Sequence, residues 1–202
     1  FLREHAPPEP FPAEWSRRWR GFSRPEVVRA PSLMLWPVDE ALVAEPTETP
    51  GARSVAHQPA WGVQGPLASG AGAAPNGLWR DLRKEDATAL TYTSAPLPEP
   101  IEILGMPTLA VMVSSDMPTA YLVARLSALD PDGIPCLISW GALNLTHREG
   151  HEGALPLTPG TRYAVRLELK ATGYRVSGGH RLRLTLATAH WPLIWPSPDP
   201  GQ

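Results

Sequence analysis

The sequence has little of several features that would point directly to a function. Its 202 residues include one cysteine, Cys136, which excludes an internal disulfide and is typical of a reducing compartment, so we expect a cytoplasmic protein. The net charge of −2 at pH 7 gives no general attraction to nucleic acid or to an anionic membrane surface. No apolar run approaches the roughly 18–20 residues of a membrane-spanning helix. We therefore expect neither nucleic acid nor a membrane as a partner.

A complete catalytic motif is also missing. The nearest approach to the G-x-S-x-G nucleophile elbow is GFSRP at Gly21–Pro25, where Pro25 replaces the second glycine and no strand precedes the motif. Cys136 lies in an apolar stretch without a basic neighbour, as a small buried residue would. We therefore predict no catalytic residue in this chain.

One pair of histidines has a spacing found in metal sites. The sequence HREGH separates His147 and His151 by three residues, which on a helix would place both ligands on one face. Gly150 and Gly153 disfavour that helix, and no Cys, Asp or third His nearby completes a ligand set. We predict no metal and no cofactor.

The chain is rich in turn-forming residues and in short alternating stretches. It has 17 glycines and 25 prolines, about a fifth of all residues, which favours many turns and little helix. Apolar residues alternate with polar ones in TRYAVRLELK and HRLRLTLA, while TAYLVARLSAL is apolar on both faces, as in a central strand. SLMLWPV and ALVAEP, joined by DE, predict a hairpin. Such strands at regular spacing are typical of an all-β sandwich.

Two regions depart from this pattern. Residues 1–30 are rich in Pro and Trp and predict an extended, irregular arm or linker, which leaves residues 31–202 as the sandwich domain. Residues 47–77 show no periodicity and predict a long irregular loop. Such a loop within a domain is unusual and often functional, and Trp61 would be out of place in a pure linker.

The last strand carries most of the remaining polar signals. We predict Leu182, Leu184 and Leu186 in the core, and Arg181 and Arg183 on an exposed outer face with mixed-sign cross-strand pairs. Gly179 would make the turn into this strand. His180 is interpreted as a structural hydrogen-bonding residue, because the chain offers it no nucleophile to activate. The role of His190 stays undecided.

A series of motifs resembles a known family. In order along the chain they are LTYTS-PL, I-G-P-L-V-VSS, ARLS-LDPDG, G-LNLTHR, LTPGTRYAVRLEL and GGHRLRLTLATAHWP. Together they resemble the C-terminal, non-catalytic domain of X-Pro dipeptidyl-peptidases and CocE/NonD-type serine hydrolases, over about residues 81–196. The resemblance implies a jelly-roll-like, galactose-binding-like β-sandwich that follows an α/β-hydrolase catalytic domain of the same parent protein. That partner domain would carry the catalytic Ser, Asp and His, and it would hydrolyse esters or X-Pro peptides.

The resemblance also suggests a place for the irregular loop. In relatives, a loop before the LTYTS-like strand reaches toward the substrate, and here that region holds His57, Trp61 and Val63. We therefore expect these three residues to wall part of the substrate cleft. A free-standing carbohydrate-binding module remains an alternative, because the chain has eight tryptophans. A homo-oligomer is compatible with the interpretation as a hydrolase domain.

Overall fold

The computed structural model describes residues 2–4, 17–18, 21, 33–46, 51–63 and 81–197. Regular structure in these ranges is almost entirely β, which confirms the predicted all-β class. The helical exceptions in this part of the chain are α1 (Arg83–Asp86) and a 3₁₀ turn at Leu145–His147. None of its helices is long and apolar enough to span a bilayer.

The largest sheet described has the strand order β3-β4-β5-β12-β8-β9. Its strands are β3 (Trp36–Val38), β4 (Ala41–Val43), β5 (Leu90–Ser94), β12 (Arg181–Ala187), β8 (Tyr121–Leu129) and β9 (Pro135–Asn144). The doubly apolar stretch predicted as a central strand is β8, which pairs with both β12 and β9. We call these six strands the central sheet.

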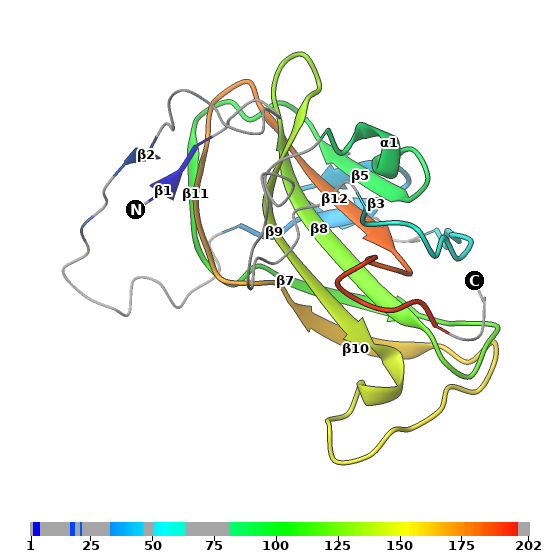
Figure 1. Cartoon of the computed structure of the whole chain (residues 1–202). Helices are drawn as coiled ribbons and strands as arrows, with labels where there is room; N and C mark the ends of the chain where they lie inside the picture. Colours follow the sequence, from blue (N-terminus) through cyan, green and yellow to red (C-terminus); the bar gives the residue numbers. More distant parts are fainter. Residues whose placement is uncertain are drawn as a thin grey trace.

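A second layer packs against the central sheet (Figure 1). It contains the antiparallel pair β7–β10 and a sheet in the order β2-β1-β11-β6. The strands are β7 (Thr108–Val113), β10 (Tyr163–Glu168), β6 (Ile101–Gly105), β11 (Thr172–Val176), β1 (Leu2–Arg3) and β2 (Arg17–Arg18). One hydrophobic core joins residues of both layers, so the fold is a β-sandwich.

Local sequence signals explain several elements. Leu182, Leu184 and Leu186 are buried in the main core, as their alternation predicts. Strand β10 alternates buried and exposed residues along its length. The predicted hairpin is β3–β4, turned by Asp39 and Glu40, with Asp39 at a positive φ of 52° that aspartate tolerates better than most residues.

The irregular regions are described only in part. Within the predicted arm, Leu2–Arg3 and Arg17–Arg18 pair with each other, and Arg3 pairs with Tyr174 of β11. Most other residues of 1–30 lie outside the described ranges, so the arm and its boundary stay predictions. Of the predicted loop 47–77, residues 51–63 are described, and they contain neither helix nor strand.

The leucine alternation in β12 generates a stability prediction. Replacing Leu184 by Ala removes a side chain that is 9% exposed and contacts the core, so unfolding free energy should fall by about 2–5 kcal/mol. Leu155→Ala is a matched control because Leu155 is 43% exposed, and its effect should stay within about 0.5 kcal/mol. Urea unfolding followed by circular dichroism measures both. Equal losses for the two variants would contradict this assignment of the core.

Candidate functional site

The outer face of the central sheet, opposite the main core, is covered rather than exposed. On this face Thr185 of β12 lies opposite Arg125 of β8, and both are 0% exposed. A buried guanidinium costs several kcal/mol unless it is paired and hydrogen-bonded. The elements that cover this face therefore have to supply partners for Arg125.

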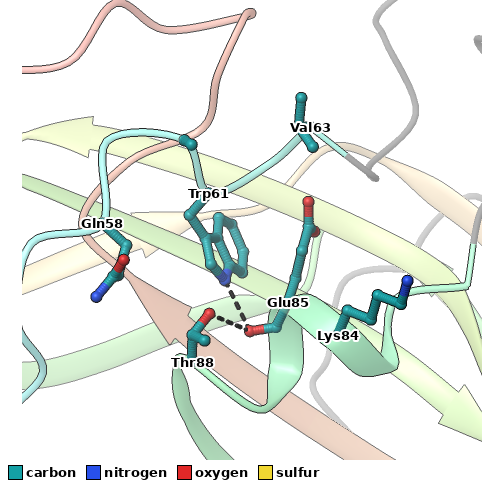
Figure 2. Close-up of a pocket in the computed structure, with 7 residues that line it drawn as sticks. Gln58, Trp61, Val63, Lys84, Glu85 and Thr88 are labelled. Carbon is teal, nitrogen blue, oxygen red and sulfur yellow. Dashed lines mark hydrogen bonds between the residues drawn. The ribbon is translucent and has the colours of Figure 1, made fainter.

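The first covering element is the turn at residues 58–63. The Trp61 amide donates to the Gln58 carbonyl at 2.9 Å and closes the turn. The Trp61 indole Nε1 donates to the main-chain oxygen of Glu85 in α1 at 3.0 Å, and Thr88 Oγ1 donates to the same oxygen (Figure 2). The Gly62 amide donates to Glu85 Oε1 at 3.0 Å. Glu85 thus binds the turn through both its main chain and its side chain.

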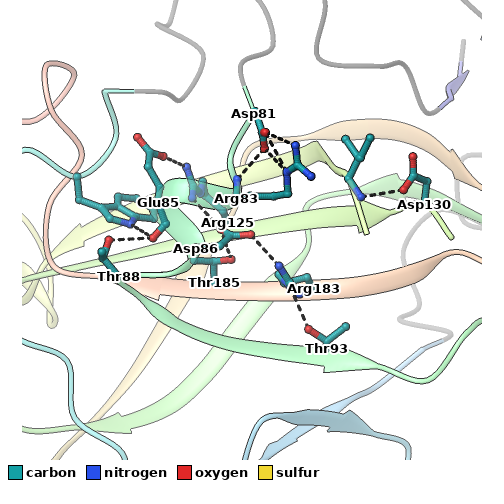
Figure 3. Close-up of polar contacts among 12 residues, drawn as sticks. Asp81, Arg83, Glu85, Asp86, Thr88, Thr93, Arg125, Asp130, Arg183 and Thr185 are labelled. Atoms are coloured by element: carbon teal, nitrogen blue, oxygen red, sulfur yellow. Dashed lines mark hydrogen bonds and ion pairs between the residues drawn. The ribbon is translucent and has the colours of Figure 1, made fainter. Parts of the chain in front are cut away.

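The second covering element is α1, whose consecutive carboxylates neutralise Arg125 (Figure 3). Arg125 Nη1 donates to Glu85 Oε2, and Arg125 Nη2 donates to Asp86 Oδ1 at 3.0 Å. Asp86 also accepts from Arg183 at 3.1 Å and from Thr185 Oγ1 at 3.1 Å. We call these five residues the Arg125 cluster. Its two cations and two anions balance, so its charge is compensated within the fold.

An aromatic ring completes the environment of Arg125. The guanidinium carbon lies 3.9 Å from the Trp61 ring centroid, a cation–π contact that is worth about 2 kcal/mol when desolvated. Trp61 itself is 3% exposed and packs with Val123, Ala187 and Ala189 in a second, smaller hydrophobic cluster. The turn at 58–63 is therefore an integral part of the fold.

His190 is a buried residue that packs against Trp61 and Trp140. It is 1% exposed, stacks on Trp140 with ring centroids 4.5 Å apart, and meets Trp61 edge-on at 5.8 Å. Burial, with a smaller contribution from the positive charge of Arg125, lowers the pKa of His190 to about 4. The undecided His190 is thus a neutral packing residue near pH 7.

The backbone of the 58–63 turn is fixed to the C-terminal turn. The Trp191 amide donates to the Trp61 carbonyl at 2.7 Å. Gly62 has φ +107°, and a Cβ at this position would lie 2.8 Å from His190 Cα. Only glycine fits there, because a side chain would meet backbone that has no room to move.

Between the 58–63 turn and α1 lies a pocket of about 230 Å³. It is lined by Gln58, Ala60, Trp61, Val63, Lys84, Glu85 and Thr88 (Figure 2). The lining combines apolar surface with the ammonium group of Lys84 and contains no serine, cysteine or histidine. Such a lining can bind and orient a small group, but it offers no nucleophile–base pair.

The structure brings two of the three predicted cleft residues together. Trp61 and Val63 line the pocket, with Val63 46% exposed and Trp61 nearly buried. His57 is not among the lining residues, and its Nδ1 lies 3.1 Å from Thr188 Oγ1.

The predicted structural residues lie at the start of β12. Gly179 has φ +79°, and it precedes His180, whose amide donates to the Ser177 carbonyl at 3.3 Å. The His180 carbonyl accepts from Leu97 at 2.8 Å. Arg181 begins β12 opposite Leu129 of β8.

The expectation of an open outer face was wrong for Arg183. This side chain does point away from the core leucines, as predicted, but it is only 22% exposed and pairs with the buried Asp86 of α1 at 3.1 Å. Its partner therefore comes from α1 and not from a neighbouring strand of the sheet. The available sequence signal for the Arg125 cluster was Arg125 itself, a charged residue within the mostly apolar stretch of β8. A buried cation at such a position requires acidic partners.

The two histidines of the HREGH sequence lie close together in space. The rings of His147 and His151 have centroids 5.4 Å apart. Across the described residues, no group of three or more His, Cys, Asp and Glu side chains is arranged to hold a metal ion.

Comparison with known proteins identifies the family to which this β-sandwich belongs. Residues 34–202 match the family model described as the X-Pro dipeptidyl-peptidase C-terminal non-catalytic domain. The chain belongs to this family. A Mycobacterium bovis protein named as a candidate serine esterase is 31% identical over 126 residues, which are 54% of this chain and 20% of that protein. The cocaine esterase of Rhodococcus sp. is 25% identical over 103 residues, or 51% of this chain and 18% of the esterase.

Solved structures show the same fold. An aminopeptidase from a marine-sediment Thaumarchaeota archaeon superposes with a TM-score of 0.72 at 23% identity, over 82% of this chain and 31% of the aminopeptidase. An α-amino acid ester hydrolase gives a TM-score of 0.72 at 22% identity, over 81% and 30%. This member of the X-Pro dipeptidyl-peptidase C-terminal family thus spans about a fifth of its curated relatives and under a third of these structures.

Removal of the Arg125 side chain should test the cluster. Arg125→Ala leaves two buried carboxylates without their main cation, so unfolding free energy should fall by about 3–5 kcal/mol. Arg166→Ala is the matched control, since its exposed side chain lies 3.6 Å from an exposed Glu168 and should cost less than about 1 kcal/mol. Urea unfolding measures both variants. A small loss for Arg125→Ala would show that the cluster contributes little to stability.

His190 generates a pH prediction. Because its folded pKa of about 4 lies below the unfolded value near 6.5, the unfolded chain binds more protons between these values. Stability from His190 is therefore full above pH 6.5 and is lost as pH falls toward 4, by about 3 kcal/mol. His190→Phe retains a ring against Trp140 and should lose this component, while the carboxylates titrate in both proteins. Parallel curves of unfolding free energy against pH would refute the assignment.

Proposed function

We propose that this chain is the accessory β-sandwich domain of a CocE/NonD-type α/β-hydrolase and that it braces the catalytic domain of the same protein. The observation that carries the proposal is the family match over residues 34–202, whose description is a C-terminal, non-catalytic domain. The matched relatives are several times longer than this chain, which leaves room for a catalytic domain. Chemistry in that domain would pass through an acyl-enzyme formed on its serine.

The names of the relatives support a proposal for the substrate class. Their names describe esterases, an aminopeptidase and an α-amino acid ester hydrolase, which all cleave an acyl–oxygen or acyl–nitrogen bond. The parent protein would therefore hydrolyse esters, or X-Pro peptides in keeping with the description of the family.

The pocket face would wall part of the substrate cleft. The 58–63 turn is suited to this role because Glu85 and Trp191 hold its backbone, while Val63 remains 46% exposed at the pocket. A wall residue held on a rigid support limits the orientations of a bound substrate without taking part in bond breaking. In this assignment the buried Trp61 packs beneath the exposed part of the wall. His57 fixes the residues that precede the turn through its hydrogen bond with Thr188.

The alternative of a carbohydrate-binding module has less support. A sugar platform uses exposed aromatic faces, and among the large hydrophobic side chains described as exposed the one tryptophan is Trp195. Its neighbour Trp191 meets it at 77°, so the two rings do not form a flat platform. The cytoplasmic location stays a prediction based on the single, buried Cys136.

The role of Val63 can be tested in the full-length protein. Val63→Asp places a charge on the proposed cleft wall, so KM for an uncharged p-nitrophenyl ester should rise about tenfold, with a smaller change in kcat. Steady-state kinetics on this ester measures the change, and an X-Pro p-nitroanilide tests whether the protein also cleaves peptides.

Met112→Asp provides the matched control. Met112 is 58% exposed and lies on β7, in the layer opposite the central sheet, so the same substitution there should leave KM unaltered. Unchanged KM for Val63→Asp would remove the cleft-wall role. If the unsubstituted full-length protein hydrolyses neither the ester nor the p-nitroanilide, the proposed reaction is wrong.

A further inference from the structure

Two uncharged stretches of the chain meet at one end of the molecule. Residues 54–63 and 185–197 contain no Asp, Glu, Lys or Arg, although 19% of the chain is charged. The hydrogen bond from the Trp191 amide to the Trp61 carbonyl and the contact of Gly62 with the His190 backbone bring them together. We call the described turns 58–63 and 190–195 the uncharged double turn.

The double turn exposes apolar side chains to solvent. Trp195 is 75% exposed, the highest value among the large hydrophobic residues described, and Val63 is 46% exposed. Pro59, Ala60 and Pro192 are also exposed. Depletion of charge combined with an exposed tryptophan is the composition of the centre of a protein–protein interface.

Other exposed hydrophobic residues lie in different surroundings. Met112 of β7 faces solvent opposite Ala164 of β10, beside the exposed ion pair of Arg166 and Glu168. That surface carries both signs of charge, as a solvated sheet face does. The double turn lacks such charges within its own segments, so it differs in composition as well as in exposure.

The double turn is also held rigidly before any partner binds. The Trp191 ring meets Trp195 at 5.6 Å and supports it from one side, while the Ile194 amide donates to the His190 carbonyl at 2.8 Å and closes the turn. His190 is itself held between Trp140 and Trp61. An anchor fixed in this way loses little conformational entropy on binding, which favours affinity.

We infer that the uncharged double turn is the surface on which the catalytic domain docks. Trp195 would be the anchor that enters an apolar recess of that domain. The inference rests on the proposed function, because the occupant is the remainder of the same protein. Two observations favour this occupant over a second copy. The chain covers only 20% of a curated relative, so a large part of such a protein lies outside it. The double turn also continues into the pocket through Val63, which places the interface at the rim of the proposed cleft.

Photo-cross-linking in the full-length protein tests the inference. With Trp195→p-benzoylphenylalanine, irradiation followed by peptide mass spectrometry should give cross-links to residues that precede Phe1 in the same molecule. Met112→p-benzoylphenylalanine is the matched control and should give none. Cross-links from position 195 between two copies of the protein, or equal yields from both positions to the preceding residues, would overturn the inference.

Cysteine labelling gives a second measurement that does not depend on the bulky probe. In the native full-length protein, Trp195→Cys should react with a maleimide at least about tenfold more slowly than Met112→Cys, because the interface must open first. Both variants should react equally in denaturant, and the unsubstituted protein supplies the background. Equal native rates would overturn the inference.

The outcomes separate this inference from the function on which it rests. Cross-linking and labelling report contact alone, whereas hydrolysis and the KM of Val63→Asp report the reaction and the cleft wall. Active protein with a freely labelled position 195 rejects only the docking surface assigned to the catalytic domain. Inactive protein with a protected position 195 rejects only the proposed reaction.

Discussion

The outer half of this domain depends on one buried cation. Arg125 points away from the main core, on a face where an unpaired guanidinium would be costly. Its demand for partners explains why α1 lies on the central sheet with two consecutive carboxylates, and why Trp61 packs over the cation. The Glu85 carboxylate, held by Arg125, in turn accepts a hydrogen bond from the Gly62 amide and fixes the 58–63 turn. The arrangement of the pocket thus follows from satisfying one charge within the sheet.

Predictability from the sequence differed between the two faces of that sheet. The core face was predictable because Leu182, Leu184 and Leu186 repeat with the period of a strand. The outer face was not, because Arg183 looks the same in a sequence whether solvent or Asp86 lies above it. Which segment covers a sheet depends on contacts between residues far apart in the chain. Only Arg125, a charge within the apolar strand β8, signalled that cover.

The candidate site was predictable to a similar extent. The aperiodic stretch around Trp61 and Val63 indicated a loop with more than a linking role, and both residues line the pocket. Glu85 was not predictable, because the sequence Lys84-Glu85-Asp86 is typical of a solvated helical turn and the burial of Glu85 depends on β8. His190 stayed undecided in the sequence because imidazole serves equally as a base, a ligand or a packing ring. Its stacking on Trp140 distinguishes these roles only in three dimensions.

The junction of the two turns has a consequence for how the domain is made. The pocket wall at Trp61 is held by an amide that belongs to Trp191, near the other end of the sequence. A nascent chain that has passed β5 and β8 therefore contains both sides of the pocket but cannot yet close it. Because such long-range contacts form late, the wall should become ordered only after β12 and the following turn have been synthesised. Closure of the pocket wall would then be coupled to synthesis of β12 and the turn that follows it, so that a product truncated before Trp191 would lack the amide that holds Trp61.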